Sequence, residues 1–417
     1  MSTNTLPSPA LKDSHSAKVS TTMAARLVHH LLGNIRTGSL TLVNRQQQLT
    51  FGTDPTLNVT VNIHADAVYN KILQGGAIGA AEAYMDGDWT TDNLTDLIRL
   101  MLRNRSLLEQ MQSRMSWLRR VAHRLYHRSR RDTVTGSKRN IADHYDLGNG
   151  FFQLFLDPTM MYSSGVFKHV TDSMEQASTN KLDIICQKLQ LTPDDHLLEI
   201  GTGWGGLAHH AALHYGCRVT TTTISEEQHQ YAARQIAEAG LGERVTLLKK
   251  DYRHLTGTYD KLVSVEMIEA VGLENLPVFF EKCASLLKPE GQMLLQSITI
   301  ADQRYEAASN SVDFIQRYIF PGGALPSVTA LLKTATEATD LRSFALEDIT
   351  EHYAETLHRW RKAFLKALPE ARQMGFDNHF IRMWDYYLAY CEGGFLERAI
   401  GCIHVQFHKP GFRRTLT

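Results

Sequence analysis

The chain has 417 residues, of which 43% are hydrophobic, and its 44 Lys and Arg residues balance 44 Asp and Glu residues. This length exceeds what one hydrophobic core usually supports, so we expect two domains. The balanced charge creates no global field toward nucleic acid or anionic lipid. Any such attraction therefore has to come from local clustering of charge.

The five cysteines are scattered and never stand in CxxC spacing. This pattern argues against a disulfide framework or a zinc knuckle and fits a reducing compartment. The first residues lack the basic start and apolar core of a signal peptide. No run of about 18 apolar residues could span a membrane. We therefore expect a cytoplasmic protein, peripheral on the inner face of the membrane, with no bound metal.

The amino-terminal part predicts a short tail followed by a small domain. Residues 1–20 are polar and rich in Ser and Thr, which predicts a disordered tail. Between residues 21 and 113, helical patterns at 24–32 and 94–102 flank alternating stretches that predict strands at 40–43 and 57–63. Residues 21–113 therefore predict a small α+β domain. We also expect this domain to associate with lipid.

Residues 114–139 are strongly basic, because they contain nine Lys and Arg residues and a single acid, Asp132. Apolar residues, Trp117 among them, fall at spacings of three and four, which predicts a basic amphipathic linker helix. We favour contact with anionic lipid headgroups, where each cationic charge adds roughly 1 kcal/mol. A solvated linker is the alternative. The aromatic and glycine modules that stack bases are missing, so we expect no nucleic-acid partner.

The remainder, residues 140–417, has an α/β pattern. Helical patterns separate five predicted strands, which argues for a parallel sheet with right-handed crossovers; the strands are 197–200, 218–224, 245–248, 261–265 and 293–298. An insertion at about 301–345 precedes a predicted helix at 353–367. Residues 403–407 close the chain as a predicted edge strand.

A glycine-rich turn, Glu199–Gly206, directly follows the first of these strands and precedes a helical pattern. Glycines at such a place let the backbone approach a ligand closely. The turn also satisfies the GxGxxG dinucleotide fingerprint, which alone is weak. Dinucleotide binding calls for an acid at the end of the second strand, and Thr220–Ile224 has none. Glu199 can instead meet the ammonium of S-adenosylmethionine, so we favour a methyltransferase.

Several motifs together resemble the cyclopropane fatty acid synthase family, which includes the mycolic acid cyclopropane synthases and other acyl-chain methyltransferases. The resemblance covers roughly residues 60–410 and rests on the following segments: Tyr84–Gly87, His144–Asn149, Leu156–Pro158, Tyr162–Ser163, Leu197–Gly206, Thr223–Gln228, Glu266–Glu269, Val271–Gly272 and Tyr318–Gly322. It implies a class I S-adenosylmethionine-dependent methyltransferase with a Rossmann-like seven-stranded sheet, a small α+β amino-terminal domain and a possible homodimer.

The resemblance also implies which residues bind the cofactor. Gln228 matches the residue that holds the ribose, and Asp251 and Tyr252 match positions that contact adenine. The full set of implied contacts is Tyr162, Ser163, Leu197, Leu198, Glu199, Ile200, Gly201, Thr202, Gly203, Trp204, Gly205, Thr223, Ile224, Ser225, Glu226, Glu227, Gln228, Asp251 and Tyr252.

In relatives, a bicarbonate ion serves as the base and is held by a Glu, a Tyr, a His and backbone groups. Glu269 and Tyr353 match the Glu and the Tyr, and Ile298 matches a backbone donor. This sequence departs from the family at Gln296, where many members have His, and at Ser164, where they have Cys.

Cys391 matches a cysteine that is sometimes called catalytic in the family. No base adjoins it in sequence, and alkylation needs no acyl-enzyme, so we expect it to pack as a small buried residue.

The chemistry that the resemblance implies begins with methyl transfer to an acyl double bond, which leaves a carbocation on the chain. A dry site with nearby negative charge suits such a cation. Proton loss to a base then closes a cyclopropane ring, whereas loss from another carbon gives a methyl- or methylene-branched chain. The expected substrate is the unsaturated acyl chain of a membrane phospholipid. A soluble acyl or secondary-metabolite substrate is the alternative.

Overall fold

The computed structural model describes residues 22–45, 47–107 and 147–413. The predicted tail and the basic segment 114–139 lie outside these residues. Packing divides the described chain into two compact units. The first contains residues 22–107, 312–319 and 357–399, and the second contains residues 147–311, 320–356 and 400–413. Among the described helices, none is long and apolar enough to cross a membrane.

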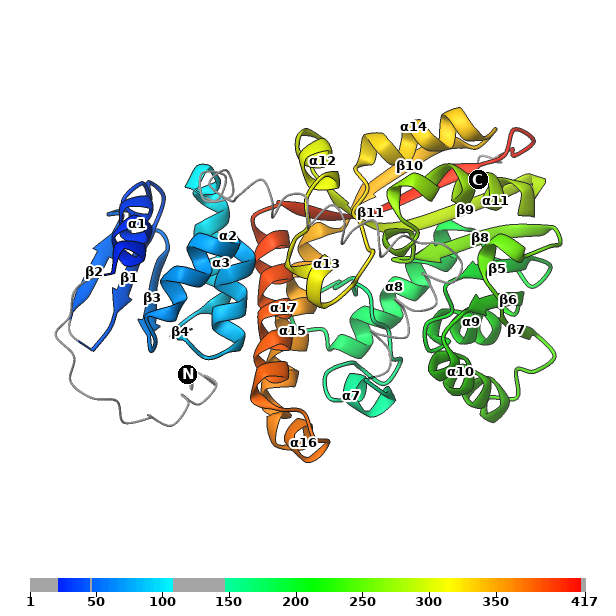
Figure 1. Ribbon diagram of the computed structural model, residues 1–417. Helices are drawn as coiled ribbons and strands as arrows, with labels where there is room; N and C mark the ends of the chain where they lie inside the picture. Colours follow the sequence, from blue (N-terminus) through cyan, green and yellow to red (C-terminus); the bar gives the residue numbers. More distant parts are fainter. Residues whose placement is uncertain (1–21, 46, 108–146, 414–417) are drawn as a thin grey trace. The chain divides into compact units, whose positions relative to one another are not determined.

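The first unit combines a four-stranded sheet, in the order β2-β1-β3-β4, with helices (Figure 1). Alternating burial along β3 reflects the alternating sequence that predicted it. The elements are α1 (Met23–Leu32), β1 (Ser39–Val43), β2 (Gln48–Phe51), β3 (Asn58–Ile63), α2 (Ala67–Met85), β4 (Trp89–Thr91), α3 (Leu94–Arg103), α13 (Phe314–Tyr318), α16 (Leu368–Gln373) and α17 (Asn378–Leu396).

Helix α17 packs against α2 and α3 although nearly 300 residues separate them in sequence. The buried Asp385 of α17 accepts a hydrogen bond from the Tyr84 hydroxyl at 2.6 Å and from Arg361 Nε at 2.7 Å. Burying the carboxylate is tolerable because both of these donors satisfy it. Residues 357–399 thus pack with the amino-terminal elements, whereas the predicted domain boundaries placed them with residues 140–417.

The second unit is an α/β layer structure around a seven-stranded sheet. Its elements are α7 (Asn149–Gln153), α8 (Met174–Lys188), β5 (His196–Ile200), α9 (Gly206–His210), η1 (Ala211–Tyr215), β6 (Arg218–Thr223), α10 (Glu226–Glu238), β7 (Val245–Lys249), η2 (Tyr252–His254), β8 (Tyr259–Val265), η3 (Ile268–Ala270), η4 (Leu273–Asn275), α11 (Leu276–Leu286), β9 (Leu287–Ile300), α12 (Asp302–Ser309), α14 (Val328–Ala338), β10 (Arg342–Asp348) and β11 (Ile400–His408). Helix α15 (Thr350–Lys366) begins in this unit and ends in the first.

The sheet order is β10-β11-β9-β8-β5-β6-β7, and β5 to β9 run parallel to one another (Figure 1). The prediction that residues 403–407 form an edge strand is wrong. Strand β11 lies between β9 and β10 and is antiparallel to both. One edge of the sheet is β10, whose first four residues fall within the predicted insertion at 301–345 and whose last three follow it. Its seven residues are all exposed, so no burial pattern indicated a strand there.

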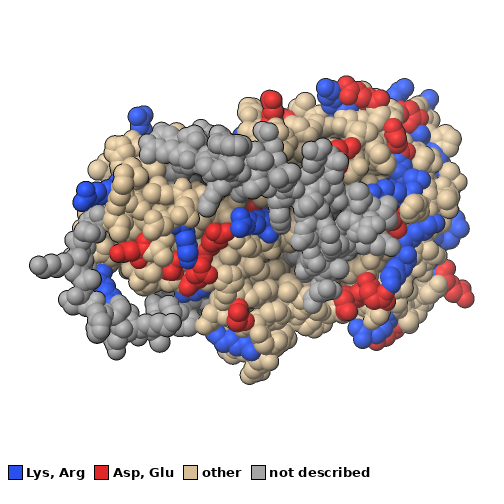
Figure 2. Space-filling view, in the orientation of Figure 1, with Lys and Arg blue, Asp and Glu red and all other residues tan. Residues whose placement is uncertain are grey.

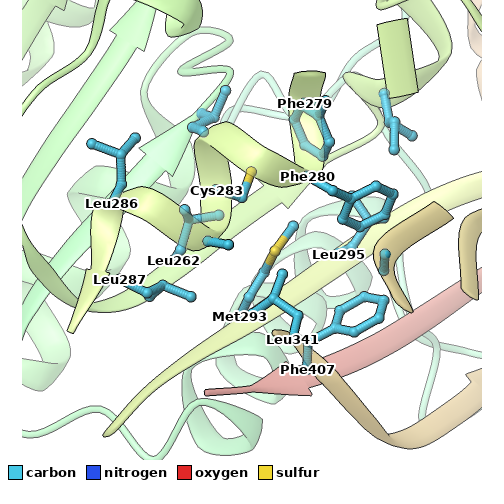
Figure 3. Packing of buried hydrophobic residues seen from close by; sticks show 14 of the residues in the cluster. Leu262, Phe279, Phe280, Cys283, Leu286, Leu287, Met293, Leu295, Leu341 and Phe407 are labelled. Carbon is cyan, nitrogen blue, oxygen red and sulfur yellow. The ribbon is translucent and has the colours of Figure 1, made fainter. Parts of the chain in front are cut away.

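Two hydrophobic cores cover opposite faces of this sheet because successive strand residues point to opposite sides. Leu198 and Leu262 join the core beneath α11 and α14, whereas their neighbours Leu197 and Val263 join the core beneath α8, α9 and α10. Figure 3 shows the first core, where Phe280 of α11 packs near Phe407 of β11, Met293 and Leu295 of β9 and Cys283 of α11.

On the face shown in Figure 2, acidic and basic side chains are interspersed over the described surface of the second unit. This distribution fits the balanced composition of the chain. The second unit also has surface ion pairs such as Lys288–Asp260, whose Nζ and Oδ1 atoms lie 2.6 Å apart. Exposed pairs of this kind contribute little to stability.

Candidate active site

The turn after β5 has the backbone geometry that its glycines predict. Gly201, Gly203 and Gly205 all have positive φ, a conformation that L side chains rarely adopt. A Cβ on Gly205 would press on Ala232 of α10, so this glycine serves close packing. A Cβ on Gly203 would meet no described residue within 4 Å, so the space beside it is open as far as the described chain extends. A ligand can therefore approach the backbone at Gly203.

Glu199 is buried at the end of β5 and accepts a hydrogen bond from Thr221 Oγ1 at 2.6 Å. Burial raises the pKa of its carboxyl to about 8, and the hydrogen bond from Thr221 and the charge of Lys181 only partly oppose this. A ligand ammonium at this position would supply the missing compensation. The residues present therefore fit the methionine end of S-adenosylmethionine.

Predicted cofactor residues also follow the carboxyl ends of the neighbouring strands β6 and β7. Ser225 caps the amino terminus of α10, and Gln228 in the first turn is buried, with Oε1 accepting from Thr223 Oγ1 at 2.9 Å. This bond leaves the Gln228 amide nitrogen to meet ligand hydroxyls. Asp251 follows β7 and is held by Arg253, whose Nε and Nη2 donate to it at 2.8 and 2.7 Å.

The segment after β8 carries two acids, of which Glu266 is the more fully hydrogen-bonded. Its Oε1 accepts from the backbone N–H of Ser164 at 3.0 Å and from Gln296 Nε2 at 2.6 Å. Its Oε2 accepts from the Tyr353 hydroxyl at 2.5 Å. The backbone of Glu266 has a φ of 48°, a strained left-handed conformation that is most often kept at functional sites.

Glu269 lies on η3 and has a different environment. Its Oε1 accepts from the backbone N–H of Ile298 at 2.6 Å and from Ser297 Oγ at 3.1 Å. Within the described residues, its Oε2 is buried without a hydrogen-bond partner. Burial, and next the charge of Glu266, raises the pKa of Glu269 to about 8. The carboxyl is therefore protonated at neutral pH.

Burial also raises the pKa of Glu266, but hydrogen bonds from Tyr353 and Ser164, the charge of Lys181 and the amide of Gln296 all oppose that effect. The two neighbouring carboxyls thus differ in the number of donors that favour the ionised form. Such a difference gives two neighbouring acids different roles, because the ionised acid can accept a proton and the protonated acid cannot. The geometry favours Glu266 as the ionised member.

A lysine with no exposed surface, Lys181 of α8, interacts electrostatically with Glu266 and donates to Ser163 Oγ at 2.7 Å. Burial lowers the pKa of Lys181 to about 8 against the opposing charges of Glu266, Asp157, Cys402 and Glu199. An ammonium has three donors, and this one has a single hydrogen bond to the described residues. It is the one buried cation that this network of described residues contains.

The cofactor turn and the acid pair lie next to each other. A Cβ on Gly201 would lie 3.3 Å from the side chain of Met267, which stands between the two acids in sequence. The hydroxyl of Ser264 on β8 also donates to the carbonyl of Ile200 at 2.9 Å. Ligands bind beyond the carboxyl ends of the strands in sheets of this kind.

A bicarbonate ion does not fit the groups that the resemblance assigned to it. Tyr353 and Gln296 already donate to Glu266, and the Ile298 N–H donates to Glu269. An added anion would meet two carboxyls and no free donor from this set. The carboxylate of Glu266 takes up the donors that the resemblance assigned to the ion.

Other predicted residues have mainly structural surroundings in the described chain. The ring of Tyr162 lies 5.3 Å from that of Phe152 and 6.5 Å from that of Phe320. Trp204 Nε1 donates to Asn149 Oδ1 at 2.7 Å. The Ser164 hydroxyl donates to the carbonyl of Gly165, so only its backbone N–H contacts Glu266. Cys391 lies on α17 in the first unit, where burial raises the pKa of its thiol.

The sequence analysis missed Glu266 and Lys181 as functional candidates. Glu266 lies within the matched segment Glu266–Glu269, but only the second acid received a role. Lys181 carried a detectable signal, because it falls on the same helical stripe as Ala177, Leu182 and Ile185. A lysine on an apolar stripe has to find a buried partner.

Together, the glycine turn, the acid pair and the seven-stranded sheet define a class I S-adenosylmethionine-dependent methyltransferase. The chain resembles the crystal structure of mycolic acid cyclopropane synthase CmaA1 complexed with SAH and CTAB, with a TM-score of 0.62 and 29% identity, over 65% of this chain and 98% of that one. This confirms the predicted fold class and enzyme class.

Two curated relatives match most of the chain. Tuberculostearic acid methyltransferase UfaA1 of Mycobacterium tuberculosis is 36% identical over 390 residues, 91% of this chain and 88% of that protein. Cyclopropane-fatty-acyl-phospholipid synthase of Escherichia coli K12 is 38% identical over 347 residues, 82% of this chain and 85% of that protein. The family model described as mycolic acid cyclopropane synthetase matches residues 133–405. The protein belongs to this family of fatty acid methyltransferases.

Proposed function

We propose that this enzyme transfers the methyl group of S-adenosylmethionine to a double bond in the unsaturated acyl chain of a membrane phospholipid. The Escherichia coli relative is named for phospholipid acyl chains, and it covers 82% of this chain. The observation that carries the proposal is the half-buried Glu266 carboxylate, held by three donors beside the cofactor turn.

The reaction needs a base in a dry site. The bound cofactor supplies an electrophilic methyl group, and the alkene electrons form the new C–C bond while the S–CH₃ electron pair remains on sulfur. A cation is left on the neighbouring chain carbon. Glu266 then accepts a proton from the added carbon, and the electrons of that C–H bond close a cyclopropane ring. Buried negative charge also stabilises the cation before the proton leaves.

The chain's own residues have separate roles in this proposal. Tyr353, Gln296 and the Ser164 N–H orient Glu266 and favour its ionised form. Glu269, protonated at neutral pH, does not compete for the proton. Glu199 and the glycine turn hold the methionine end of the cofactor, and Gln228 holds the ribose. These assignments replace the bicarbonate that the resemblance implied.

A second product is also consistent with this site. Tuberculostearic acid methyltransferase covers 91% of the chain, and its name describes methylation of a fatty acid. If Glu266 removes a proton from a chain carbon instead of the added one, the product is a methyl-branched acyl chain that retains a double bond. The position of the acyl chain relative to Glu266 decides between ring and branch.

We also propose that the protein works on the inner face of the membrane, with the basic segment 114–139 contacting anionic headgroups. That segment holds nine Lys and Arg residues and one acid. Charge reversal of Arg119, Arg120 and Arg124 should weaken binding to anionic vesicles, and added salt should have the same effect. Unchanged vesicle binding by this variant would contradict the proposed contact.

The test of the reaction uses the purified full chain, vesicles of monounsaturated phosphatidylglycerol and cofactor with a fully deuterated methyl group. Mass spectrometry of the acyl chains should show a gain of one labelled carbon. A ring retains two deuterium atoms and no double bond, whereas a methyl-branched alkene retains three. Label on a free soluble acyl donor but not on vesicle lipid would contradict the phospholipid assignment.

A further inference from the structure

A series of hydrogen bonds connects the part-exposed Lys188 with the half-buried Glu266. Lys188 Nζ lies 2.7 Å from His404 Nδ1, and His404 Nε2 lies 2.9 Å from Gln296 Oε1. Gln296 Nε2 then donates to Glu266 at 2.6 Å. Lys188 is part-exposed at the last position of α8, whereas His404 and Gln296 are buried.

The fold holds these partners in place by backbone pairing. His404 of β11 lies directly opposite Gln296 of β9, so their side chains are cross-strand neighbours. The end of α8 is fixed to the same strand, because Gln406 Nε2 donates to the carbonyl of Lys188 at 2.9 Å. The chain of contacts is therefore supported by secondary structure at each step.

The direction of each hydrogen bond follows from the first donor. An ammonium can only donate, so His404 Nδ1 has to be the unprotonated acceptor. The proton of the neutral imidazole then lies on Nε2 and is donated to Gln296 Oε1. With its oxygen used in this way, the Gln296 amide presents its NH₂ group to Glu266.

We propose that Lys188 and His404 are positioning residues for the base Glu266, because they set the histidine tautomer and thereby the orientation of the Gln296 amide. This inference rests on the proposed role of Glu266 in proton removal. Without the lysine, His404 could carry its proton on Nδ1. Gln296 would then turn its oxygen toward Glu266, which favours the protonated carboxyl over the ionised base.

Other charged or titratable groups also face the residues of this hydrogen-bond series. Lys181 of α8, Tyr353 of α15, Cys402 of β11 and Glu269 of η3 face Glu266. Lys181 and His352 of α15 act on His404. Lys188 also pairs with Glu347 of β10 at 2.5 Å. Within the described residues, none of these groups donates to His404 Nδ1 as Lys188 does. Removing Lys188 therefore changes this contact and leaves the effects of the other groups in place.

The test is the pH dependence of kcat on vesicle substrate for Lys188→Met and His404→Leu. Both variants should move the acid limb to higher pH by about one unit, which is roughly a tenfold loss of rate below the limb. His404→Gln, which restores a donor at the Nε2 position, and Lys188→Arg should return the limb toward the wild-type position. Lys288→Met is the matched control, since Lys288 pairs with Asp260 on the surface.

A second readout does not depend on activity or on variant stability. Nitrogen NMR of histidine-labelled wild-type protein should show His404 as the Nε2–H tautomer, and it should stay neutral through the acid limb. A uniform loss of kcat with an unmoved limb, or an Nδ1–H tautomer in the wild type, would overturn the inference. Full turnover by Glu266→Gln would instead refute the proposed base while leaving the tautomer result intact.

Discussion

The Tyr353 hydroxyl lies 2.5 Å from Glu266 Oε2, so a tyrosine expected to hold an added ion binds a carboxylate of the chain itself. Tyr353→Phe removes this donor and leaves the ring in place. The hydrogen bond lowers the pKa of Glu266, so its loss raises that pKa. We expect kcat at neutral pH to fall by about 10- to 100-fold, with the acid limb of the pH profile at higher pH.

The measurement is kcat across the pH range on unsaturated phospholipid vesicles. Tyr259→Phe is a suitable control, because its hydroxyl donates to the Thr256 carbonyl away from the site. A profile for Tyr353→Phe that overlies the wild-type profile would show that the contact with Glu266 has no role in turnover.

Cofactor affinity should depend on the ionisation of Glu199. Burial raises the pKa of the free carboxyl to about 8, so it is mainly neutral at pH 6 and gains charge as the pH rises toward 8. Only the ionised form pairs with a ligand ammonium. Affinity for S-adenosylmethionine should therefore increase between pH 6 and 8, by at most about tenfold per unit, and Glu199→Gln should weaken binding and flatten this dependence.

Isothermal titration calorimetry in buffers of different ionisation enthalpy checks this prediction, since binding should release protons from the wild type. A wild-type affinity that is constant over this range, with no proton release, would mean that Glu199 is not the partner of the ammonium.

Lys181 should support both activity and stability. Replacing a whole buried ion pair with apolar side chains is often neutral or stabilising, whereas removing one partner leaves the other charge uncompensated. Lys181→Met leaves Glu266 without its cation, so we expect the free energy of unfolding to fall by at most about 5 kcal/mol. Turnover should fall, because Lys181 opposes the rise in the pKa of Glu266.

The pH dependence of stability tests whether the pKa of Lys181 is lowered in the folded protein. The pKa of Lys181 is about 8 in the folded state, below its value in the unfolded chain. At pH values between these two pKa values, the unfolded state therefore binds more protons than the folded state. The lysine therefore makes the wild type more stable as the pH rises above 8. Denaturant titrations should show that Lys181→Met lacks this increase, and an increase identical to that of the wild type would contradict the assignment.

The interior position of β11 predicts a large cost for changes in its apolar side chains. Phe407 is 1% exposed, and its ring lies 5.7 Å from that of Phe280. Phe407→Ala should reduce the free energy of unfolding by about 3–5 kcal/mol. Leu346 on the edge strand β10 is 47% exposed, so Leu346→Ala should cost less than about 0.5 kcal/mol. Equal midpoints in urea for the two variants would contradict this strand order.

The sequence predicts the framework of the second unit well, for physical reasons. Apolar runs predict β5 and β8 because these central strands are largely buried. The Thr-rich strand β6 is predicted by its β-branched residues. The turn at Glu199–Gly206 is predicted because only glycine adopts its backbone freely. Strand β10 escapes prediction since its seven exposed residues carry no burial pattern.

The site is only partly predictable because its contacts join distant parts of the chain. Glu266 meets Ser164, Gln296 and Tyr353, which come from a loop, a strand and a helix. Nothing local distinguishes Glu266 from Glu269, since both are acids in one short segment. The packing of α17 with α2 and α3 likewise depends on Asp385 and Tyr84, which are 301 residues apart.

The claim that Glu266 is the base is tested most directly by measuring turnover of Glu266→Gly with and without added bicarbonate. Glycine accepts the φ of 48° at this position and removes the side chain whose carboxylate accepts hydrogen bonds from Tyr353 and Gln296. We expect the wild type to be as active in bicarbonate-free buffer as in buffer with bicarbonate. The variant should be inactive without bicarbonate and regain turnover when it is added. A wild type that requires bicarbonate, or a variant that is fully active without it, would contradict the claim that Glu266 is the base.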